Sequence, residues 1–219
     1  VMADALAQAT VTPLVVHVDD HLATAGDLIG SVDYDDFWAE GADDPAWPRP
    51  ADEWQAMCLN YTSGTTGNPK GVVFHHRGGY LNAIGNAIAF GLDADSRYLW
   101  TLPMFHCNGW TFTWAVTAVM GTHVCLRQVD PAEIFASIRD NWVTHMCAAP
   151  VVLTMLIHAP AEAKTSFPQT VEIATGGAAP PSQVIESMET LGFQVTHLYG
   201  LTETYGPATI CAWPPEWDD

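Results

Sequence analysis

The sequence Tyr61-Thr62-Ser63-Gly64-Thr65-Thr66-Gly67-Asn68-Pro69-Lys70-Gly71 follows the apolar run Ala56-Met57-Cys58-Leu59, with only Asn60 between them. Glycines let backbone N–H groups turn toward an anion without a Cβ clash, hydroxyl groups donate to phosphate oxygens, and a lysine adds a positive charge. The stretch therefore predicts a phosphate-binding loop after a buried strand. Its spacing differs from the usual P-loop, because Lys70 precedes Gly71 instead of Ser or Thr. A polar hairpin loop that binds no ligand is the alternative.

Three further motifs follow along the chain. They are Leu102-Pro103-Met104-Phe105-His106-Cys107-Asn108-Gly109-Trp110, Thr175-Gly176-Gly177-Ala178-Ala179-Pro180 and Leu198-Tyr199-Gly200-Leu201-Thr202-Glu203-Thr204. In this order, the four motifs resemble those of the acyl-adenylate-forming superfamily of AMP-binding enzymes, and the likeness extends over residues 58–213. Residues 103–110 and 205–209 are most similar to short- and medium-chain acyl-CoA ligases such as methylmercaptopropionate-CoA ligase.

The resemblance implies an AMP-forming acyl-CoA ligase. Such an enzyme joins a small carboxylic acid to the α-phosphate of ATP with Mg²⁺, releases pyrophosphate, and passes the acyl group to the thiol of CoA. Two alternatives stay open. One is a related adenylating enzyme that loads another acceptor, such as a carrier protein. The other is a nucleotide-binding module that is inactive when isolated.

The resemblance also assigns nucleotide-binding residues. Thr202 and Glu203 match the positions that contact the α-phosphate and the metal, and a carboxylate suits Mg²⁺ that keeps its waters. Tyr199 matches the position whose ring stacks on adenine, with Gly177 and Ala178 beside it. The residues that match the family's loop for the β- and γ-phosphates are Thr62, Ser63, Gly64, Thr65, Thr66, Gly67 and Lys70. An ordinary exposed acid is the alternative for Glu203, and a core tyrosine is the alternative for Tyr199.

His106 matches the histidine of an aromatic–histidine pair that lines the acyl site in the family. A histidine beside a carbonyl can hydrogen-bond the acyl oxygen, so His106, Thr202 and Glu203 are the expected catalytic residues. Trp110 lies four residues later, so a regular helix would present both side chains on one face. Trp110 could then limit acyl length or could pack in the core. The expected acyl pocket consists of His106, Trp110, Gly176, Gly177, Gly200 and Leu201.

The charge of the chain bounds its partners. A formal net charge of −18 argues against DNA, RNA or an anionic membrane surface. Residues 1–60 hold twelve Asp or Glu against one Arg, so most of the excess lies outside the phosphate loop. No apolar run is long enough to span a membrane, and residues 1–4 do not resemble a signal peptide. We expect a cytoplasmic protein whose five cysteines are reduced core thiols. Nothing in these patterns specifies an oligomeric state.

Strand and helix patterns alternate along the chain, which predicts an α/β fold with a largely parallel sheet and crossover helices. A buried strand is expected at 13–18, and further strands are expected at 72–74, 97–102, 122–126, 145–148, 171–175, 193–198 and 209–212. Helices are expected at 33–40, 76–90, 110–120, 130–141, 151–158 and 181–191. Residues 1–53 should form an acidic connector and 54–219 the nucleotide- and acyl-binding core. The resemblance implies a central piece of the large N-terminal domain of an adenylate-forming enzyme, without the C-terminal domain that carries the adenylation lysine.

Overall fold

The computed structural model describes residues 1–23, 26–46, 48–62 and 67–212. It divides into two compact units, Val1–Arg49 and Pro50–Asp219. The first unit contains α1 (Met2–Gln8), β1 (Val16–His17), β2 (Val32–Asp33) and α2 (Tyr34–Ala39). β1 and β2 are parallel, and the Asp33 carboxylate caps α2 by accepting a 2.8 Å hydrogen bond from the N–H of Asp35. The expected helix at 33–40 is therefore confirmed.

The first unit has no packed core. None of its described residues is buried, and Leu14 and Val18 are both exposed. The expectation of a buried strand over residues 13–18 is therefore wrong, since only Val16 and His17 pair with β2. A pair of two-residue strands offers too few neighbours to cover an apolar face.

The second unit begins with an antiparallel hairpin of β3 (Ala56–Tyr61) and β4 (Gly71–His75). The strand before the phosphate loop was expected to be buried, and this is wrong. Leu59 is 52% exposed and Asn60 is the buried residue of β3. The physical reason is that β3 pairs with β4 in a two-stranded sheet, so one face of the hairpin stays open.

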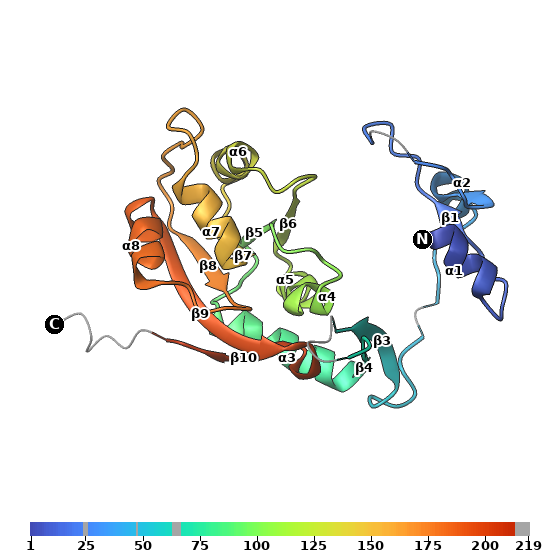
Figure 1. The fold of residues 1–219 in the computed structure, drawn as a ribbon. Helices are drawn as coiled ribbons and strands as arrows, with labels where there is room; N and C mark the ends of the chain where they lie inside the picture. Colours follow the sequence, from blue (N-terminus) through green and yellow to red (C-terminus); the bar gives the residue numbers. More distant parts are fainter. Residues whose placement is uncertain (24–25, 47, 63–66, 213–219) are drawn as a thin grey trace. The chain divides into compact units, whose positions relative to one another are not determined.

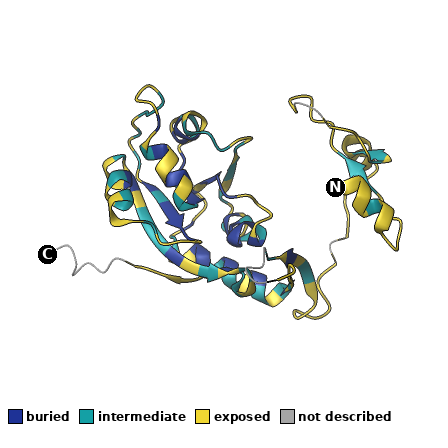
Figure 2. Cartoon of the chain, viewed as in Figure 1, coloured by how far each residue is buried: buried dark blue, intermediate teal, exposed yellow. Residues whose placement is uncertain are grey.

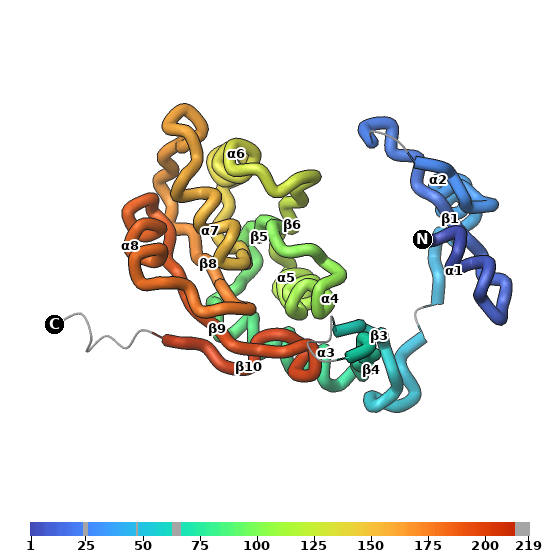
Figure 3. The backbone as a smooth tube through the Cα atoms, viewed as in Figure 1, coloured from blue at the N-terminus to red at the C-terminus, as the bar shows by residue number. Residues whose placement is uncertain are grey.

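The main sheet has six strands in the order β10-β9-β8-β7-β5-β6, and every pair except β9–β10 is parallel (Figures 1 and 3). β6 and β7 lie on opposite sides of β5, so the winding reverses there. This confirms the expected largely parallel α/β sheet. The strands are β5 (Arg97–Trp100), β6 (Thr122–Cys125), β7 (His145–Ala148), β8 (Val171–Thr175), β9 (Phe193–Leu201) and β10 (Gly206–Ile210).

Helices cover both faces of the sheet. Along β5, Leu99 packs with α6, α7 and α8, whereas Tyr98 and Trp100 pack with α3 and α5. This alternation is the two-residue period of a strand that is buried on both faces. Figure 2 shows the buried residues concentrated between the layers. The helices are α3 (His76–Ala89), α4 (Cys107–Trp110), α5 (Phe112–Ala118), α6 (Pro131–Asn141), α7 (Pro150–Ile157) and α8 (Ser182–Thr190), with the 3₁₀ turn η1 (Thr202–Thr204).

Local sequence explains where α6 begins. The Asp130 carboxylate accepts hydrogen bonds from the N–H groups of Ala132 (2.9 Å) and Glu133 (3.2 Å), and Pro131 occupies the first helical position. This start was expected from the sequence. No helix in the described residues is long and apolar enough to cross a membrane.

The cysteines are only partly as expected. All five are free thiols. Cys107 and Cys147 are buried, and burial raises the pKa of Cys147 to about 12. Cys125 and Cys211 are exposed, so the expectation of core thiols is wrong for these two. Both lie on strands or strand ends at the border of the sheet, where one side faces solvent.

His145 on β7 predicts a pH dependence of stability. Its Nε2 donates to the carbonyl oxygen of Phe90 at 2.9 Å, while Nδ1 lies 2.8 Å from Thr144 Oγ1. Burial lowers the pKa of His145 below 6.5. Above that pH both folded and unfolded states hold a neutral ring. Below it the unfolded state binds more protons, so stability falls as the pH falls toward the folded-state pKa.

The variant His145→Gln tests this, because its amide can still donate to Phe90. Between about pH 7 and pH 5.5 its melting temperature should fall less than that of the wild type. An identical fall in both proteins would contradict this assignment.

Candidate functional site

The carboxyl ends of the parallel strands carry the last three motifs. His106 follows β5, Gly176 directly follows β8, and Leu201 ends β9 before Thr202 and Glu203. Open α/β sheets bind ligands outside these strand ends, next to the point where the winding reverses. The winding here reverses at β5. The fold therefore brings motifs that are far apart in the sequence to one edge of the sheet (Figure 1).

The loop expected to bind phosphate connects the two strands of the hairpin. The N–H of Thr62 donates to the carbonyl oxygen of Lys70 at 2.9 Å, and the N–H of Lys70 donates to Thr62 Oγ1 at 3.4 Å. Gly67 and Lys70 are exposed. Four of the expected phosphate-binding residues lie outside the described residues: Ser63, Gly64, Thr65 and Thr66. A hairpin geometry is common to the phosphate loop and to its ligand-free alternative, so phosphate binding stays a prediction.

The segment after His106 has an unusual backbone. Five consecutive residues have positive φ angles between 46° and 64°, and four of them are not glycine. The left-handed region costs an L-residue roughly 1–2 kcal/mol, so such a turn persists only where contacts hold it. The residues are Cys107, Asn108, Gly109, Trp110 and Thr111. We call them the left-handed segment.

This backbone corrects the expected relation of His106 to Trp110. The two side chains do not share one face of a regular helix, since α4 is non-helical at Asn108 and Gly109. His106 is exposed, whereas Trp110 is 7% exposed and belongs to the core cluster between the sheet and α3 and α5. The regular helix α5 begins only at Phe112. The helix expected at 110–120 is therefore wrong in its first two and its last two residues, since α5 spans Phe112–Ala118.

Buried amides hold the left-handed segment from two sides. Asn86 on α3 is 4% exposed and donates to the carbonyl oxygen of Trp110 (2.9 Å) and to Thr111 Oγ1 (2.8 Å). Asn60 on β3 donates to Asn108 Oδ1 at 2.7 Å. The amide of Asn60 therefore joins the phosphate-loop hairpin to the left-handed segment.

The Thr202–Glu203 motif forms the short turn η1. Thr202 Oγ1 lies 3.3 Å from the Sγ of Cys107 in the left-handed segment. Burial raises the pKa of the Cys107 thiol, its hydrogen bond with Thr202 lowers this pKa, and the charge of Glu203 raises it further. Cys107 therefore stays a neutral thiol that hydrogen-bonds Thr202. Glu203 is exposed next to this contact, so its carboxylate is accessible to a ligand.

Tyr205 fixes the end of the same turn. It has a φ angle of 66°, and its hydroxyl accepts a 3.2 Å hydrogen bond from the N–H of His75. The centroid of its ring lies 4.1 Å from the centroid of the Phe74 ring. The ring occupies the space where a Cβ at Gly78 would lie, so glycine at the start of α3 lets the tyrosine pack closely.

Two glycines of the expected acyl pocket have structural reasons to lack a side chain. A Cβ at Gly176 would lie 2.6 Å from Leu198 Cδ1 and 3.2 Å from Trp110 Cη2. A Cβ at Gly200 would clash with the carbonyl oxygen of Gly206 on β10. Backbone and indole atoms therefore approach closely where β8 and β9 end, and Trp110 lies against Gly176.

The residues expected beside adenine lie at the open edge of the site. Tyr199 is 58% exposed, which contradicts its alternative as a core tyrosine. Gly177 has a φ angle of 82°, with open space around its Cβ position. Gly177 and Ala178 are both exposed. These residues are available to a ligand, and their role in adenine binding stays a prediction.

The donor atoms fit one kind of metal ion. Among the residues that the structure describes, no group of three or more His, Cys, Asp or Glu side chains could hold a metal. Mg²⁺ does not need such a group, because it commonly binds one or two carboxylates together with substrate phosphates and waters. The exposed carboxylate of Glu203 beside Thr202 fits that mode.

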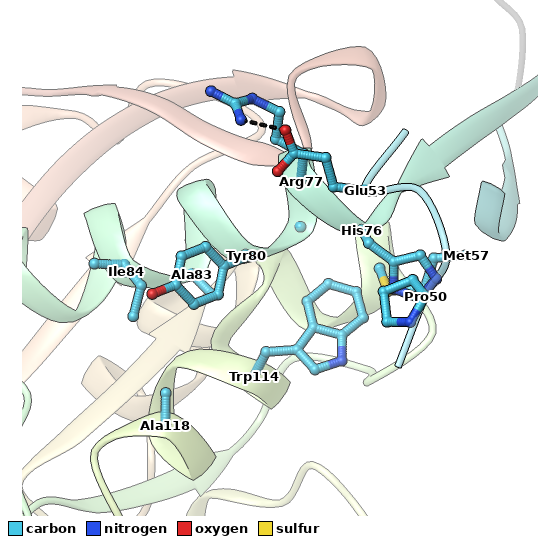
Figure 4. A pocket seen from close by; sticks show the side chains of 11 residues that line it. Pro50, Glu53, Met57, His76, Arg77, Tyr80, Ala83, Ile84, Trp114 and Ala118 are labelled. Atoms are coloured by element: carbon cyan, nitrogen blue, oxygen red, sulfur yellow. Dashed lines mark hydrogen bonds and ion pairs between the residues drawn. The ribbon is translucent and has the colours of Figure 1, made fainter. Parts of the chain in front are cut away.

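A separate pocket of about 420 Å³ lies between α3 and α5 (Figure 4). Met57, Tyr80 and Trp114 face one another across it, and an ion pair of Arg77 and Glu53 at 2.6 Å lies at one side. None of the residues that the motifs assign to nucleotide or acyl binding lines this pocket. The last three motifs lie instead at the carboxyl ends of β5, β8 and β9.

Except for Asn108, the asparagine amides that support the site are not marked by the four sequence motifs. Asn60, Asn82, Asn86 and Asn108 all make hydrogen bonds that link separate parts of the site. One signal was present in the sequence, because Asn82 and Asn86 are four residues apart in a helix of mostly small and apolar residues. Polar side chains at that spacing lie on the same face of a helix.

The chain is similar in sequence to two plant CoA ligases and in structure to a bacterial coenzyme A synthetase. The peroxisomal acetate/butyrate–CoA ligase of Arabidopsis thaliana is 50% identical over 212 residues, which are 94% of this chain and 37% of that protein. An acetate–CoA ligase of Humulus lupulus is 48% identical, with the same coverage. O-succinylbenzoate coenzyme A synthetase of Bacillus subtilis, in complex with ATP and magnesium, superposes with a TM-score of 0.72 at 28% identity, over 85% of this chain and 38% of that one.

The chain spans 37% of the length of these two curated relatives. One relative is named as peroxisomal, so a cytoplasmic location stays a prediction. The family model described as AMP-binding enzyme matches residues 2–219. This chain belongs to the AMP-binding enzyme family.

Proposed function

We propose that this chain is the nucleotide- and acyl-binding part of an AMP-forming acyl-CoA ligase. In the reaction, a carboxylate oxygen of the acid attacks the α-phosphorus of ATP, and the bond to pyrophosphate breaks. The thiol of CoA then attacks the acyl carbonyl, and AMP leaves. The chain itself binds the nucleotide and orients the acid. It also places positively charged groups beside the phosphates, whose negative charge they stabilise during the reaction.

One observation carries this proposal. The 3.3 Å contact between Cys107 Sγ and Thr202 Oγ1 joins the segment after His106 to the Thr202–Glu203 turn, at the carboxyl edge of the sheet. A residue suited to an acyl group and residues suited to the α-phosphate and its metal are thereby neighbours. Adenylate formation requires that neighbourhood, because the new bond joins these two groups.

Each part of the site then has a role. Thr62, Gly67 and Lys70 belong to the loop for the leaving phosphates, together with residues 63–66. Thr202 contacts the α-phosphate. When Mg²⁺ is bound, Glu203 holds it and the ion neutralises phosphate charge. The ring of Tyr199 stacks on adenine beside Gly177 and Ala178.

The acyl site suits short acids. Trp110 fills the space against Gly176, while Gly177, Gly200 and Leu201 line the remaining side and His106 lies at the exposed end. The names of both curated relatives specify acetate as a substrate, and one adds butyrate. We propose acids of this size for the protein that carries this chain, with CoA as the acceptor.

Nucleotide binding by the chain itself tests the proposal. Isothermal titration with ATP and Mg²⁺ should show one site, and Tyr199→Ala should weaken it. Stacking of a base on an aromatic ring is worth about 1–3 kcal/mol, so the dissociation constant should rise by about 5- to 150-fold.

Tyr34→Ala is the matched control, because Tyr34 is also an exposed tyrosine but lies on α2 in the other unit. We expect it to bind ATP as the wild type does. Equal binding by Tyr199→Ala and wild type would remove Tyr199 from the adenine site. An absence of ATP binding in the wild-type chain would contradict the proposed function.

A further inference from the structure

Asn82 lies in the middle of a series of hydrogen-bonded side chains that crosses the site. It is partly buried on α3, one turn before Asn86. Its Nδ2 donates to the carbonyl oxygen of Pro207 at 2.7 Å and lies 3.5 Å from that of Thr204. These two carbonyls flank the turn that follows Glu203, so one amide contacts the backbone on both sides of Tyr205.

The hydrogen bonds around Asn82 have one consistent direction. Asn86 Nδ2 donates to Thr111 Oγ1 at 2.8 Å, and Thr111 Oγ1 donates to Asn82 Oδ1 at 2.6 Å. Because Asn82 Oδ1 accepts, its Nδ2 must face the other way, toward Pro207. From donor to acceptor, the hydrogen bonds therefore run from Asn86 to Thr111, from Thr111 to Asn82, and from Asn82 to the carbonyl of Pro207. Hydrogen bonds aligned in this way strengthen one another in a buried site.

The two ends of this series of hydrogen bonds lie at residues whose backbone conformation is unfavourable without supporting contacts. At one end, Thr111 has a φ angle of 64° and closes the left-handed segment. At the other end, Tyr205 has a φ angle of 66° and closes the turn that carries Glu203. Residues other than glycine need such contacts to stay in this region. Asn82 touches both elements, and α3 provides a rigid support between them.

We infer that Asn82 is a positioning residue, which sets the place of Glu203 relative to the segment after His106. This inference rests on the proposed function. Asn82 does not touch the reacting groups in this role. It fixes the backbone that carries the metal-binding carboxylate, so its loss should be felt most where Mg²⁺ contributes to nucleotide binding.

The test compares ATP binding by the 219-residue chain with and without Mg²⁺. Asn82→Asp keeps the size of the side chain and the acceptor for Thr111, but it removes the donor to Pro207. We expect the affinity for ATP in Mg²⁺ to fall by about tenfold or more, because the hydrogen bond to a buried carbonyl is lost and a carboxylate oxygen faces the carbonyls of Pro207 and Thr204 instead. Affinity measured with EDTA in place of Mg²⁺ should change much less. A loss of fold would lower both values equally, so the split separates positioning from stability.

Two further variants complete the test. Asn141→Asp makes the same substitution at an exposed asparagine at the end of α6 and should bind as wild type. Asn82 Oδ1 accepts from Thr111 Oγ1 at 2.6 Å and also from Asn86 Nδ2 at 3.3 Å. Thr111→Val removes only the first of these donors and should show the same Mg²⁺-dependent loss in a smaller amount. If Asn82→Asp fails to fold, the result for Thr111→Val decides whether the inference holds.

The outcomes are distinct. Folded Asn82 variants with wild-type affinity at every Mg²⁺ concentration would overturn the inference and leave the proposed function intact. An equal loss with Mg²⁺ and with EDTA would also overturn it, since Asn82 would then support the fold as a whole. If the wild-type chain bound no ATP, the result would instead contradict the proposed function.

Discussion

Glu203→Gln should lower the rate of acyl-adenylate formation by about 100-fold or more in the ligase that we propose to carry this chain. The substitution keeps the size of the side chain and removes its charge. Glu203 is exposed in the turn η1 and has Thr202 beside it, so a bound Mg²⁺ would lose its protein carboxylate. Release of pyrophosphate at limiting and at saturating Mg²⁺ measures the effect, which should be larger at limiting Mg²⁺.

Glu186→Gln is the matched control, because Glu186 is an exposed glutamate on α8. It should have the wild-type rate at both Mg²⁺ concentrations. If Glu203→Gln also had the wild-type rate at limiting Mg²⁺, Glu203 would not bind the metal. Its alternative as an ordinary exposed acid would then hold.

The core of the fold was accessible to sequence analysis because it depends on local patterns. The start of α6 follows from one capping aspartate and one proline, and the six predicted strands from 97–102 to 209–212 all appear in the sheet. Errors arose where tertiary pairing decides burial. Residues 13–18 and 56–59 are apolar enough for buried strands, yet β1 and β3 each pair in a two-stranded sheet. Apolar character specifies a strand but not what covers it.

The site was predicted only in part. The motifs marked residues that end up at one edge of the sheet, such as His106, Gly176 and Glu203. The left-handed segment was missed, because its non-glycine residues normally favour right-handed backbone and the contacts that hold them come from Asn60 and Asn86. Long-range hydrogen bonds of this kind leave no periodic pattern in the sequence.

Trp110→Ala should destabilise the chain strongly. Trp110 is 7% exposed within the core cluster between the sheet and α3 and α5, and removal of a buried tryptophan costs about 3–5 kcal/mol. In a unit of this size, the melting temperature should fall by about 10 °C. Trp142→Ala isolates the contribution of burial. Trp142 has the same φ angle of 53° but is 57% exposed, so its replacement should change the melting temperature little.

The same variant tests the acyl pocket. Trp110 Cη2 lies 3.2 Å from the Cβ position of Gly176, so the indole reaches the edge where the acid is expected to bind. Removing it should open that space, and each additional buried methylene of the acid is worth about 0.8 kcal/mol. For acids two or three carbons longer, kcat/KM relative to acetate should therefore rise by roughly 10- to 60-fold. The measurement is the chain-length profile of the ligase at a temperature where the variant is folded. A large fall in melting temperature with an unchanged profile would assign Trp110 to core packing alone, and the limit on acyl length would then have to come from other residues of the pocket.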